Sequence, residues 1–461
     1  MLFSKLYATD SKLEIAGITS DSRKVGKGFL FFAIKGKNSD GHNYIAEAIK
    51  NGATAIIGEN PAVILPVPYF PSKNIRHDLA IAAASFYQQK PKTIAVVTGT
   101  NGKTSVADFV RQLWELDGKD AVSIGTLGFI KKKTIKQFEA DNTTPDPVVL
   151  NELLTHAKDA AIIEGSSIGL EQHRLDGLKI NAAAFTNFTR DHLDYHASME
   201  DYFRAKTLLF ANSMNEGVAV LNSDIPEYER LKEICHDRKH EIITFGSYGD
   251  LQLVESIPLN DGQIIKLDIF NHASEYKIPL AGKFQAENIL CALGLVIACG
   301  MDQAKALSYI EKLKSIPGRM EQAAPGIFVD YAHTPDALEN ALSSLRPHTK
   351  NRLIVVFGCG GDRDKGKRPE MGRIADQLAD VVIVTDDNPR TEVPATIRRE
   401  ILASSAKAVE IGDREKAIQN AVSNMHDGDI LLVAGKGHEK YQIIGKDKQH
   451  FDDVEVVRKY I

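Results

Sequence analysis

The architecture of this chain follows from one stretch, TIAVVTGTNGKTS, which spans Thr93 to Ser105. Thr93 to Val97 is a short, nearly continuous apolar run, which is typical of a strand buried on both faces of a parallel sheet. The glycine-rich turn Gly99 to Ser105 follows, and we expect a helix from Thr104. The turn therefore lies at the carboxyl edge of the sheet, where parallel sheets bind their ligands.

The turn GTNGKTS has the features of a phosphate-binding loop. Its glycines let backbone N–H groups point toward an anion, and the helix N-terminus adds a favourable dipole. Lys103 is placed to reach terminal phosphates, and the Thr104 hydroxyl to hold Mg²⁺. The general pattern has a glycine where this chain has Val97, so the loop is a variant. The turn predicts a nucleotide site; a strand-to-helix turn without a ligand is the alternative.

Short apolar strands alternate with helices along the chain, which predicts parallel sheets covered on both faces. The other expected strands are Phe29 to Ile34, Ala53 to Ile57, Ala160 to Glu164, Ala182 to Thr186, Leu353 to Phe357, Val381 to Thr385 and Ile430 to Ala434. Helices are expected near Tyr44 to Lys50 and Leu79 to Tyr87. Proline-containing breaks at Gln88 to Lys92 and Ser315 to Arg319 separate three domains, residues 1–90, 91–317 and 318–461. We predict an α/β protein with a central P-loop ATPase-like parallel sheet and a Rossmann-like C-terminal domain.

Composition narrows the class of protein. Lysine and arginine number 56 against 61 acidic residues, so a net charge of −5 gives no general attraction for nucleic acid or an anionic membrane. The four cysteines have no CxxC spacing, which argues against a disulfide scaffold or structural zinc. We find no apolar stretch of membrane-spanning length and no signal-peptide pattern at the N-terminus, and we expect a cytoplasmic protein.

Two further clusters lie near the phosphate loop in the predicted fold. Glu164 ends an apolar strand in IIEGSS, where its carboxylate could reach the same Mg²⁺ as Thr104; a surface or capping acid is the alternative. The segment NFTRDHLDYH contains His192 and His196, four residues apart, which suggests a zinc pair. We reject zinc there, because no third ligand has metal-site spacing and the phosphate loop already implies Mg²⁺.

The motifs, taken in order, resemble those of the Mur ligases, the ATP-dependent amide-forming enzymes of peptidoglycan assembly. The matching segments are DSRKVGKGFLFFAIKG, GTNGKTS, IIEGSS, NFTRDHLDYH with Lys206, GKFQAEN, PGRME, DYAHTPDAL, GCGGDRDKGKRP, DNPR and GKGHEKYQ, and together they cover nearly the whole chain. The resemblance implies that residues 1–90 bind a UDP-sugar, residues 91–317 bind ATP and residues 318–461 bind an amino acid. It also implies roles in cell wall biogenesis, cell shape and cell division.

The resemblance implies a chemistry in which the γ-phosphoryl group of ATP goes to a carboxylate, and an amine attacks the resulting acyl phosphate. Lys103, Glu164, His192 and Lys206 match the catalytic residues. Thr104, Glu164, His192 and Lys206 match the Mg²⁺ site, with Lys206 as a carbamate formed from CO₂; without the family, Lys206 would be a solvated surface lysine. The implied ATP contacts are Gly99, Thr100, Asn101, Gly102, Lys103, Thr104, Ser105, Asn288, Arg319 and Asp330.

The substrates that the resemblance implies are UDP-N-acetylmuramoyl-L-alanyl-D-glutamate and meso-2,6-diaminopimelate. The implied contacts of the nucleotide-sugar dipeptide are Ser20, Ser22, Lys37, Asn38, Ser39, Asn142, Thr143, Thr144, Ser166, Gln172 and Arg174. Diaminopimelate differs from lysine by one carboxylate, which an arginine fork recognises best. The matching residues for diaminopimelate are Arg363, Asp387, Asn388, Pro389, Arg390, Gly435 and Glu439, with Arg390 as the clamp.

Some alternatives stay open at this point. Read without the family, DNTTP is a turn, the segment around Gln172 a solvated helix face, and DNPR a loop. Ile168 stands where family members often have histidine, which affects the sugar-peptide contacts but removes no metal ligand. A folylpolyglutamate synthetase-like ligase is the nearest rival, and a catalytically silent nucleotide-binding regulator is the other. We expect a monomer that binds small molecules and neither nucleic acid nor a membrane.

Overall fold

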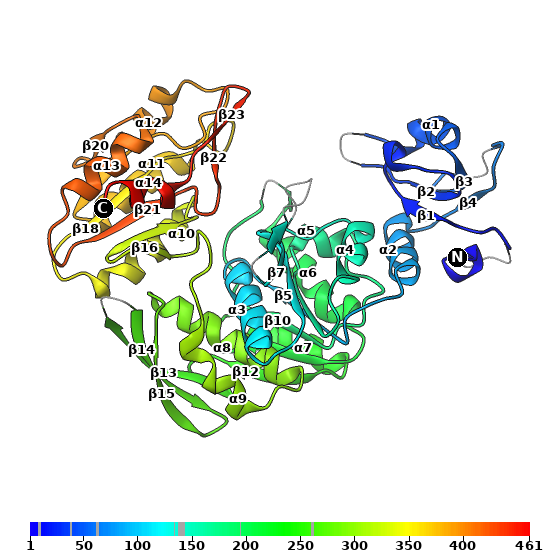
Figure 1. The fold of residues 1–461 in the computed structure, drawn as a ribbon, viewed down its shortest axis with the longest axis horizontal. Coiled ribbons are helices and arrows are strands. Elements are labelled where there is room, and N and C mark those ends of the chain that lie inside the picture. Colours follow the sequence, from blue (N-terminus) through cyan, green and yellow to red (C-terminus); the bar gives the residue numbers. More distant parts are fainter. Residues whose placement is uncertain are drawn as a thin grey trace. The chain divides into compact units, whose positions relative to one another are not determined.

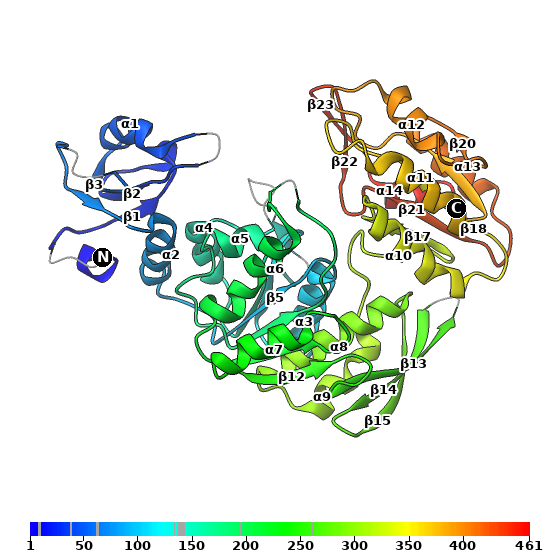
Figure 2. The ribbon, with the colours of Figure 1, turned by 180° about the vertical axis from the view of Figure 1, so that it is seen from behind.

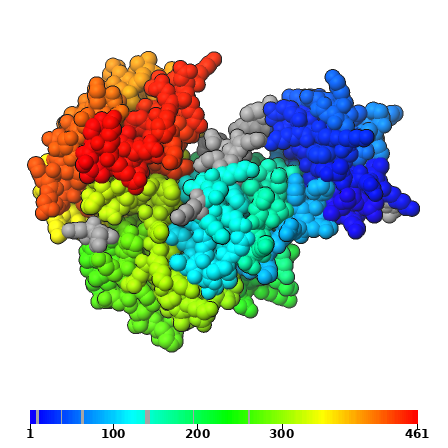
Figure 3. All heavy atoms as spheres, in the orientation of Figure 1, coloured from blue at the N-terminus to red at the C-terminus, as the bar shows by residue number. Residues whose placement is uncertain are grey.

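The computed structural model describes residues 1–7, 11–36, 39–60, 64–132, 134–136, 143–193, 195–259 and 262–461. The chain forms two compact units, the first of Met1–Leu251 with Leu290–Leu307 and the second of Gln252–Ile289 with Ser308–Ile461. Figures 1 and 2 show the elements of each unit from opposite sides. Figure 3 shows the face seen in Figure 1 with all heavy atoms drawn as spheres.

The first unit begins with a small parallel sheet of order β1-β2-β3-β4. Its strands are β1 (Gly17–Thr19), β2 (Phe29–Ala33), β3 (Ala53–Gly58) and β4 (Tyr69–Pro71), with helices α1 (Ile45–Lys50) and α2 (Ile75–Phe86). Side chains alternate along β2: Leu30 and Phe32 join the core that contains Leu79 of α2, whereas Phe31 joins the core that contains Ala48 of α1. The two helices therefore cover opposite faces of the sheet.

A larger sheet follows in the same unit, with strand order β12-β11-β10-β5-β9-β6-β7-β8. The strands are β5 (Thr93–Thr98), β6 (Ala121–Gly125), β7 (Gly128–Lys131), β8 (Thr134–Lys136), β9 (Ala160–Glu164), β10 (Ala182–Phe185), β11 (Val218–Asn222) and β12 (Glu241–Phe245). Pairing is parallel from β12 through β6, and antiparallel where β7 and β8 are added. β5 lies inside this sheet, as its apolar sequence predicts.

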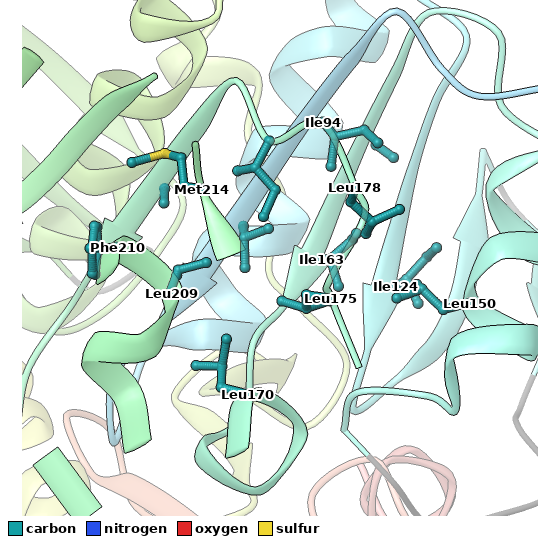
Figure 4. Close-up of a cluster of buried hydrophobic side chains, with 14 of the residues drawn as sticks. Ile94, Ile124, Leu150, Ile163, Leu170, Leu175, Leu178, Leu209, Phe210 and Met214 are labelled. Carbon is teal, nitrogen blue, oxygen red and sulfur yellow. The ribbon is translucent and has the colours of Figure 1, made fainter. Parts of the chain in front are cut away.

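Helices pack on both faces of the larger sheet. They are α3 (Lys103–Leu116), α4 (Pro147–Leu154), α5 (Ser167–Glu171), α6 (Met199–Leu208), the π-helical turn Leu209–Ser213, α7 (Tyr228–Asp237), and parts of α8 (Lys283–Ala298) and α9 (Gln303–Ser308). α3 packs on β5, β6 and β9. Figure 4 shows the opposite core, where Ile94, Ile163 and Phe210 are among the buried side chains. Burial on both faces explains why these strands are apolar throughout.

The second unit contains two groups of strands. One group is β13 (Leu251–Leu259), whose first residue belongs to the first unit, with the antiparallel pair β14 (Gly262–Ile269) and β15 (Ala273–Ile278). The other is a sheet of order β16-β17-β21-β18-β19-β20. The strands of that sheet are β16 (Glu321–Ala324), β17 (Ile327–Asp330), β18 (Leu353–Phe357), β19 (Val381–Val384), β20 (Val409–Glu410) and β21 (Ile430–Ala434), and a hairpin, β22 (Tyr441–Ile444) and β23 (Asp447–His450), follows. In the sheet from β16 to β20, β16 pairs antiparallel with β17, and all the other strand pairings are parallel.

Helices of the second unit again cover both sheet faces. They are α10 (Pro335–Leu345), α11 (Lys367–Leu378), α12 (Pro394–Leu402), α13 (Arg414–Ser423) and α14 (Asp453–Lys459). Val355 of β18 joins the core containing Leu342 and Ile374, whereas Val356 joins the core containing Ile418 and Val457. The predicted α/β class with parallel sheets is confirmed. The three-domain boundaries stay a prediction. None of the helices in the described ranges has both the length and the apolar character to cross a membrane.

Candidate functional site

The glycine-rich turn after β5 takes the conformation of a strand-to-helix phosphate loop. Gly99 has a φ of 137° and Gly102 a φ of 85°, and α3 begins at Lys103. A Cβ on Gly99 would lie 2.0 Å from Thr186 Oγ1, so both the backbone angle and the space require glycine. The missing glycine at Val97 does not prevent this turn, because Val97 is still inside β5.

The segment that follows β10 holds the loop in place. The backbone N–H of Thr100 donates to the Asn187 carbonyl oxygen (2.9 Å), and that of Asn101 donates to Asn187 Oδ1 (2.8 Å). Thr186 Oγ1 donates to the Asn101 carbonyl oxygen (2.6 Å). The loop is therefore shaped by the chain itself rather than by a ligand, which reduces the ordering entropy lost on binding.

Lys103 folds over its own loop. Its ammonium group donates to the carbonyl oxygens of Gly99 (3.0 Å) and Thr100 (2.7 Å). This position, at the N-terminal end of α3, is where an anion would be attracted by the helix dipole and by the backbone N–H groups of the first turn. The charge of Lys103 and its place at the start of α3 therefore fit the binding of a phosphate group.

Thr104 and Glu164 meet at the carboxyl edge of the sheet. Thr104 Oγ1 donates to Glu164 Oε2 at 3.0 Å, and both side chains are buried. Parallel pairing of β5 with β9 places Glu164 opposite Val97. Thr126 completes the surroundings by donating its backbone N–H to Oε1 (2.9 Å) and its hydroxyl to Oε2 (3.1 Å). A buried carboxylate beside a hydroxyl is an oxygen-rich pair that fits Mg²⁺.

Lys206, on α6, is buried and not a solvated surface lysine. Its side chain is among the largest fully buried ones, its Nζ donates to the Gly99 carbonyl oxygen at 2.6 Å, and Nζ lies 4.4 Å from the centroid of the Tyr202 ring. Burial, with a smaller contribution from the charge of Lys103, lowers the pKa of Lys206 well below its usual value. The amine therefore loses its proton more readily than that of an exposed lysine, and it lies at the phosphate loop.

The two histidines of NFTRDHLDYH have different surroundings. His192 is in a left-handed backbone conformation, and its ring meets the Tyr202 ring with centroids 5.9 Å apart. His196 is buried and hydrogen-bonded to Ser167 Oγ (2.9 Å), and burial lowers the pKa of its imidazole. Neither histidine belongs to a cluster of three metal-ligating side chains among the described residues.

A cavity of about 630 Å³ lies in the first unit, between the small sheet and the larger one. Five of the predicted nucleotide-sugar contacts line it, namely Ser20, Ser22, Ser39, Gln172 and Arg174. The guanidinium of Arg174 donates to the Thr144 carbonyl oxygen and to Gln172 Oε1 (2.8 Å). Arg76 and Asp146 also line the cavity, and burial raises the pKa of the Asp146 carboxyl group. Arg76 is a lining residue that the sequence motifs did not indicate.

The remaining nucleotide-sugar residues lie near this cavity or outside the described ranges. Thr144 Oγ1 donates to the Glu164 carbonyl oxygen (2.7 Å) and lies 3.0 Å from Ser166 Oγ, while Thr143 Oγ1 lies 3.2 Å from Thr126 Oγ1. Thr143 is thus linked to the Glu164 carboxylate through Thr126, whereas Thr144 contacts the Glu164 backbone. Ile168 is half-buried in α5. Lys37, Asn38 and Asn142 lie outside the described residues.

In the second unit, the loop DNPR follows β19 and is fixed by buried contacts. Asn388 Nδ2 donates to Glu439 Oε2 (2.8 Å), and Asn388 Oδ1 accepts from the backbone N–H of Ile443 (2.9 Å). Arg390, in a left-handed conformation, donates from Nη1 to the Gly361 carbonyl oxygen (2.9 Å). A Cβ on Gly435 would lie 2.6 Å from Asp387 Oδ2. The predicted residues Asp387, Asn388, Arg390, Gly435 and Glu439 therefore form one cluster.

Lys436 belongs to this cluster but was not predicted. Its side chain is fully buried, and its ammonium donates to Asn388 Oδ1 (3.2 Å) and to the Tyr441 carbonyl oxygen, with Glu439 Oε2 at 3.6 Å. Burial lowers the pKa of Lys436, which neighbouring carboxylates partly counteract. The GKG spacing after an apolar strand was the available signal, but it could not show that the side chain turns inward.

The other residues predicted for the second unit occupy separate loops. Asp330 ends β17 and accepts from the backbone N–H groups of Met320 (2.6 Å) and Ala332 (2.8 Å), and burial raises the pKa of its carboxyl group. The Arg319 guanidinium carbon lies 4.8 Å from the centroid of the Tyr331 ring. Asn288 is buried in α8, and Arg363 is exposed in the loop after β18. The hydrogen bond from Met320 thus joins the segment that contains Arg319 to the end of β17.

Family models match most of the chain. A Mur ligase family, catalytic domain covers residues 14–93, the Mur ligase middle domain covers residues 97–296, and the Mur ligase, glutamate ligase domain covers residues 318–437. The chain therefore belongs to the Mur ligase family, a class of ATP-dependent amide ligases, as its motifs predict.

Named relatives are similar over nearly their full length. The "UDP-N-acetylmuramoyl-L-alanyl-D-glutamate--2,6-diaminopimelate ligase" of Mesorhizobium japonicum is 48% identical over 460 residues, which cover 97% of this chain and 94% of the relative. A solved structure with the same name has a TM-score of 0.76 at 33% identity and covers 100% of this chain and 98% of its own. A folylpolyglutamate synthase structure from Mycobacterium tuberculosis has a TM-score of 0.61 at 18% identity, covers 78% of this chain and 92% of its own, and shows a shared fold only.

Proposed function

We propose that this protein is an ATP- and Mg²⁺-dependent ligase that adds meso-2,6-diaminopimelate to UDP-N-acetylmuramoyl-L-alanyl-D-glutamate. The reaction would supply a peptidoglycan precursor in the cytoplasm, and we expect the enzyme to act as a monomer. The observation that carries the proposal is the near full-length similarity to enzymes of that name, combined with buried clusters at both GTNGKTS and DNPR. A catalytically silent regulator would have no reason to retain both clusters.

The first unit would activate the carboxylate. Lys103 and the backbone N–H groups of the loop would bind the triphosphate and neutralise charge as the γ-phosphoryl group moves to the peptide carboxylate. Thr104, Glu164, His192 and Lys206 would hold the Mg²⁺, which, when bound, neutralises phosphate charge. Because the chain supplies positioning and charge, no protein nucleophile is needed.

A carbamate on Lys206 is part of the proposal. The neutral amine would attack CO₂, forming an N–C bond and releasing one proton, so that an uncharged amine becomes an anionic oxygen ligand. The burial of Lys206 supports this chemistry, because the lowered pKa favours the neutral amine that attacks CO₂. The Gly99 carbonyl oxygen, 2.6 Å from Nζ, already orients the amine at the loop.

The second unit would select the incoming amine. Arg390 would bind the distal carboxylate of diaminopimelate, and Glu439, oriented by Asn388, would receive the distal ammonium group. Asn288, Arg319 and Asp330 would contact the adenine, phosphate and ribose of ATP. Arg363 would supply a second arginine to the amino acid. The predicted amino-acid site contains two arginines, Arg363 and Arg390, and two carboxylates, Asp387 and Glu439. These charges fit a zwitterionic amino acid that is charged at both ends.

A competition assay tests the proposal. The enzyme is incubated with ATP, Mg²⁺, the nucleotide dipeptide and equal diaminopimelate and lysine, and the product is identified by mass. We expect the diaminopimelate adduct and phosphate release only when all substrates are present. A lysine adduct in equal amount would contradict the selectivity. In a separate reaction with ATP, Mg²⁺, glutamate and a pterin substrate, a glutamate adduct would favour the rival. Activity unchanged by Lys103→Ala would contradict the ATP site.

A further inference from the structure

A second cluster of ligand-type side chains lies beside the cavity of the first unit. It consists of His77, near the start of α2, and His173 with Asp176, in the turn after α5. One ligand atom from each of the three lies within 4.8 Å of the other two. The proposed ligase reaction does not use any of these residues.

Both imidazole rings direct Nδ1 at the same carboxylate oxygen. His77 Nδ1 lies 2.7 Å and His173 Nδ1 2.8 Å from Asp176 Oδ2, and the two rings meet edge to face with centroids 5.8 Å apart. His77 is 45% exposed, His173 30% and Asp176 13%. The three side chains thus meet at one point although they come from two separate elements. They are also exposed enough for an ion to reach them from solvent.

The donor set and the spacing suit zinc. Two imidazole nitrogens and one carboxylate oxygen are the ligand set of many three-ligand zinc sites, with bonds of about 2.0–2.2 Å. Tetrahedral angles at that bond length separate ligand atoms by roughly 3.4 Å, so each of the present N···O distances would lengthen by about 0.6 Å. Mg²⁺ and Ca²⁺ prefer oxygen ligands and fit this set poorly.

Other groups already orient the cluster from outside. Asn74 Nδ2 lies 3.2 Å from His173 Nε2, and Ser213 Oγ donates to Asp176 Oδ1 at 3.3 Å. An ion on Nδ1 requires the proton to move to Nε2, and Asn74 Nδ2, which faces Nε2 here, is a donor and cannot accept from it. Asn74 Oδ1 meanwhile accepts from the backbone N–H of His77 at 3.2 Å, as the cap of α2. A carboxylate at position 74 would serve both as cap and as acceptor for Nε2–H.

We propose that His77, His173 and Asp176 form a zinc site that braces α2 against the turn after α5. The sequence neighbours of the ligands line the cavity: Arg76 beside His77, and Gln172 and Arg174 on either side of His173. A bound ion would therefore hold these lining residues at a fixed spacing. The site is a support for the cavity, with water as the fourth ligand, and it takes no part in phosphoryl transfer.

The test uses the full chain, stripped with chelator and kept in excess Mg²⁺, without nucleotide or amino acid. It therefore fails or succeeds independently of the proposed ligase reaction. Co²⁺, which substitutes for zinc and absorbs visible light, is titrated in, and Zn²⁺ is then added to displace it. We expect one Co²⁺ per chain, displaced by an equal amount of Zn²⁺.

The variants His77→Asn and His173→Asn should each weaken Co²⁺ binding by more than about 100-fold, since a lost ligand exceeds the 10- to 100-fold effect of an outer group. The matched control His156→Asn, at an exposed histidine after α4, should bind Co²⁺ as the natural chain does. Asn74→Asp should tighten binding by about 10-fold. Melting curves without metal check that each variant folds.

Three results would overturn the proposal. The natural chain could bind no Co²⁺ under these conditions, or a folded His77→Asn variant could bind it with unchanged affinity. Weaker Co²⁺ binding by Asn74→Asp would contradict the assignment of Nδ1 as the ligand atom. If the histidine variants do not fold, the zinc site is still tested by the number of Co²⁺ ions that the natural chain binds and by the Co²⁺ affinity of Asn74→Asp.

Discussion

Replacing Arg390 with alanine should change which amino acid this enzyme accepts. Arg390 Nη1 donates to the Gly361 carbonyl oxygen at 2.9 Å and lies 3.5 Å from the Asn388 carbonyl oxygen. Its Nε and Nη2 groups make no hydrogen bond within the part of the chain that the structure describes. A carboxylate bound by those two donors would gain two charge-assisted hydrogen bonds, each worth about 1.5–3 kcal/mol.

The expected loss is therefore about 3–6 kcal/mol for diaminopimelate, which lowers kcat/KM roughly 10²- to 10⁴-fold. Lysine lacks the distal carboxylate and should lose less than about 3-fold. The left-handed backbone at position 390 costs roughly 1–2 kcal/mol for arginine and alanine alike, so the substitution adds no backbone strain.

Steady-state phosphate release with each amino acid measures this difference. Arg390→Lys is the matched control, because it keeps the charge but loses the fork, and it should recover only part of the discrimination. An equal loss for diaminopimelate and lysine would show that Arg390 shapes the loop without reading the carboxylate. No loss for either would refute its role altogether.

Three further changes test other parts of the account. Glu164→Gln keeps the shape of the side chain that Thr104 contacts but removes its charge. It should lower kcat about 10²-fold or more and raise the Mg²⁺ concentration needed for half-maximal activity. An unchanged Mg²⁺ dependence would contradict the assignment of Glu164 as an Mg²⁺ ligand. Asp453→Asn leaves the buried charge of Arg414 unpaired and should lower the free energy of unfolding by about 3–5 kcal/mol in denaturant titrations; a change below about 1 kcal/mol would contradict it. The hydrogen bond from Arg368 lowers the pKa of Glu392 to about 2, so the ion pair stabilises the fold above pH 4.5 and loses this effect as the pH falls toward 2. The difference in Tm between the natural chain and Glu392→Gln should therefore shrink over that range. A constant difference in Tm would argue against a stabilising ion pair.

The strands and the phosphate loop could be predicted because their signals are local. The expected strands Ala160–Glu164, Leu353–Phe357 and Ile430–Ala434 have the observed bounds, since apolar runs buried on both faces end where polar residues begin. The expected helix at Leu79 in fact begins at Ile75, because Asn74 accepts from the His77 backbone N–H and caps the helix there. Helix starts depend on caps, which are harder to recognise than apolar runs.

The site residues that depend on tertiary contacts were beyond a local argument. Lys206 has a sequence typical of a surface helix, and only the fold shows its burial against the Tyr202 ring. Lys436 follows an apolar strand, but its contact with Asn388 joins residues 48 positions apart. His77 and Asp176 are 99 positions apart, so no spacing rule could have linked them. The family resemblance supplied the role of Lys206 but gave no indication of the other two.

The fate of one oxygen atom tests the central claim most directly. The nucleotide dipeptide is labelled with ¹⁸O in the glutamate carboxylate that accepts the amino acid, and the reaction is run to completion with ATP, Mg²⁺ and diaminopimelate. If the carboxylate is phosphorylated before the amine attacks, the released phosphate carries one ¹⁸O atom, as mass spectrometry would show. Phosphate without label would contradict an acyl phosphate, and with it the roles proposed for Lys103, Thr104 and Glu164.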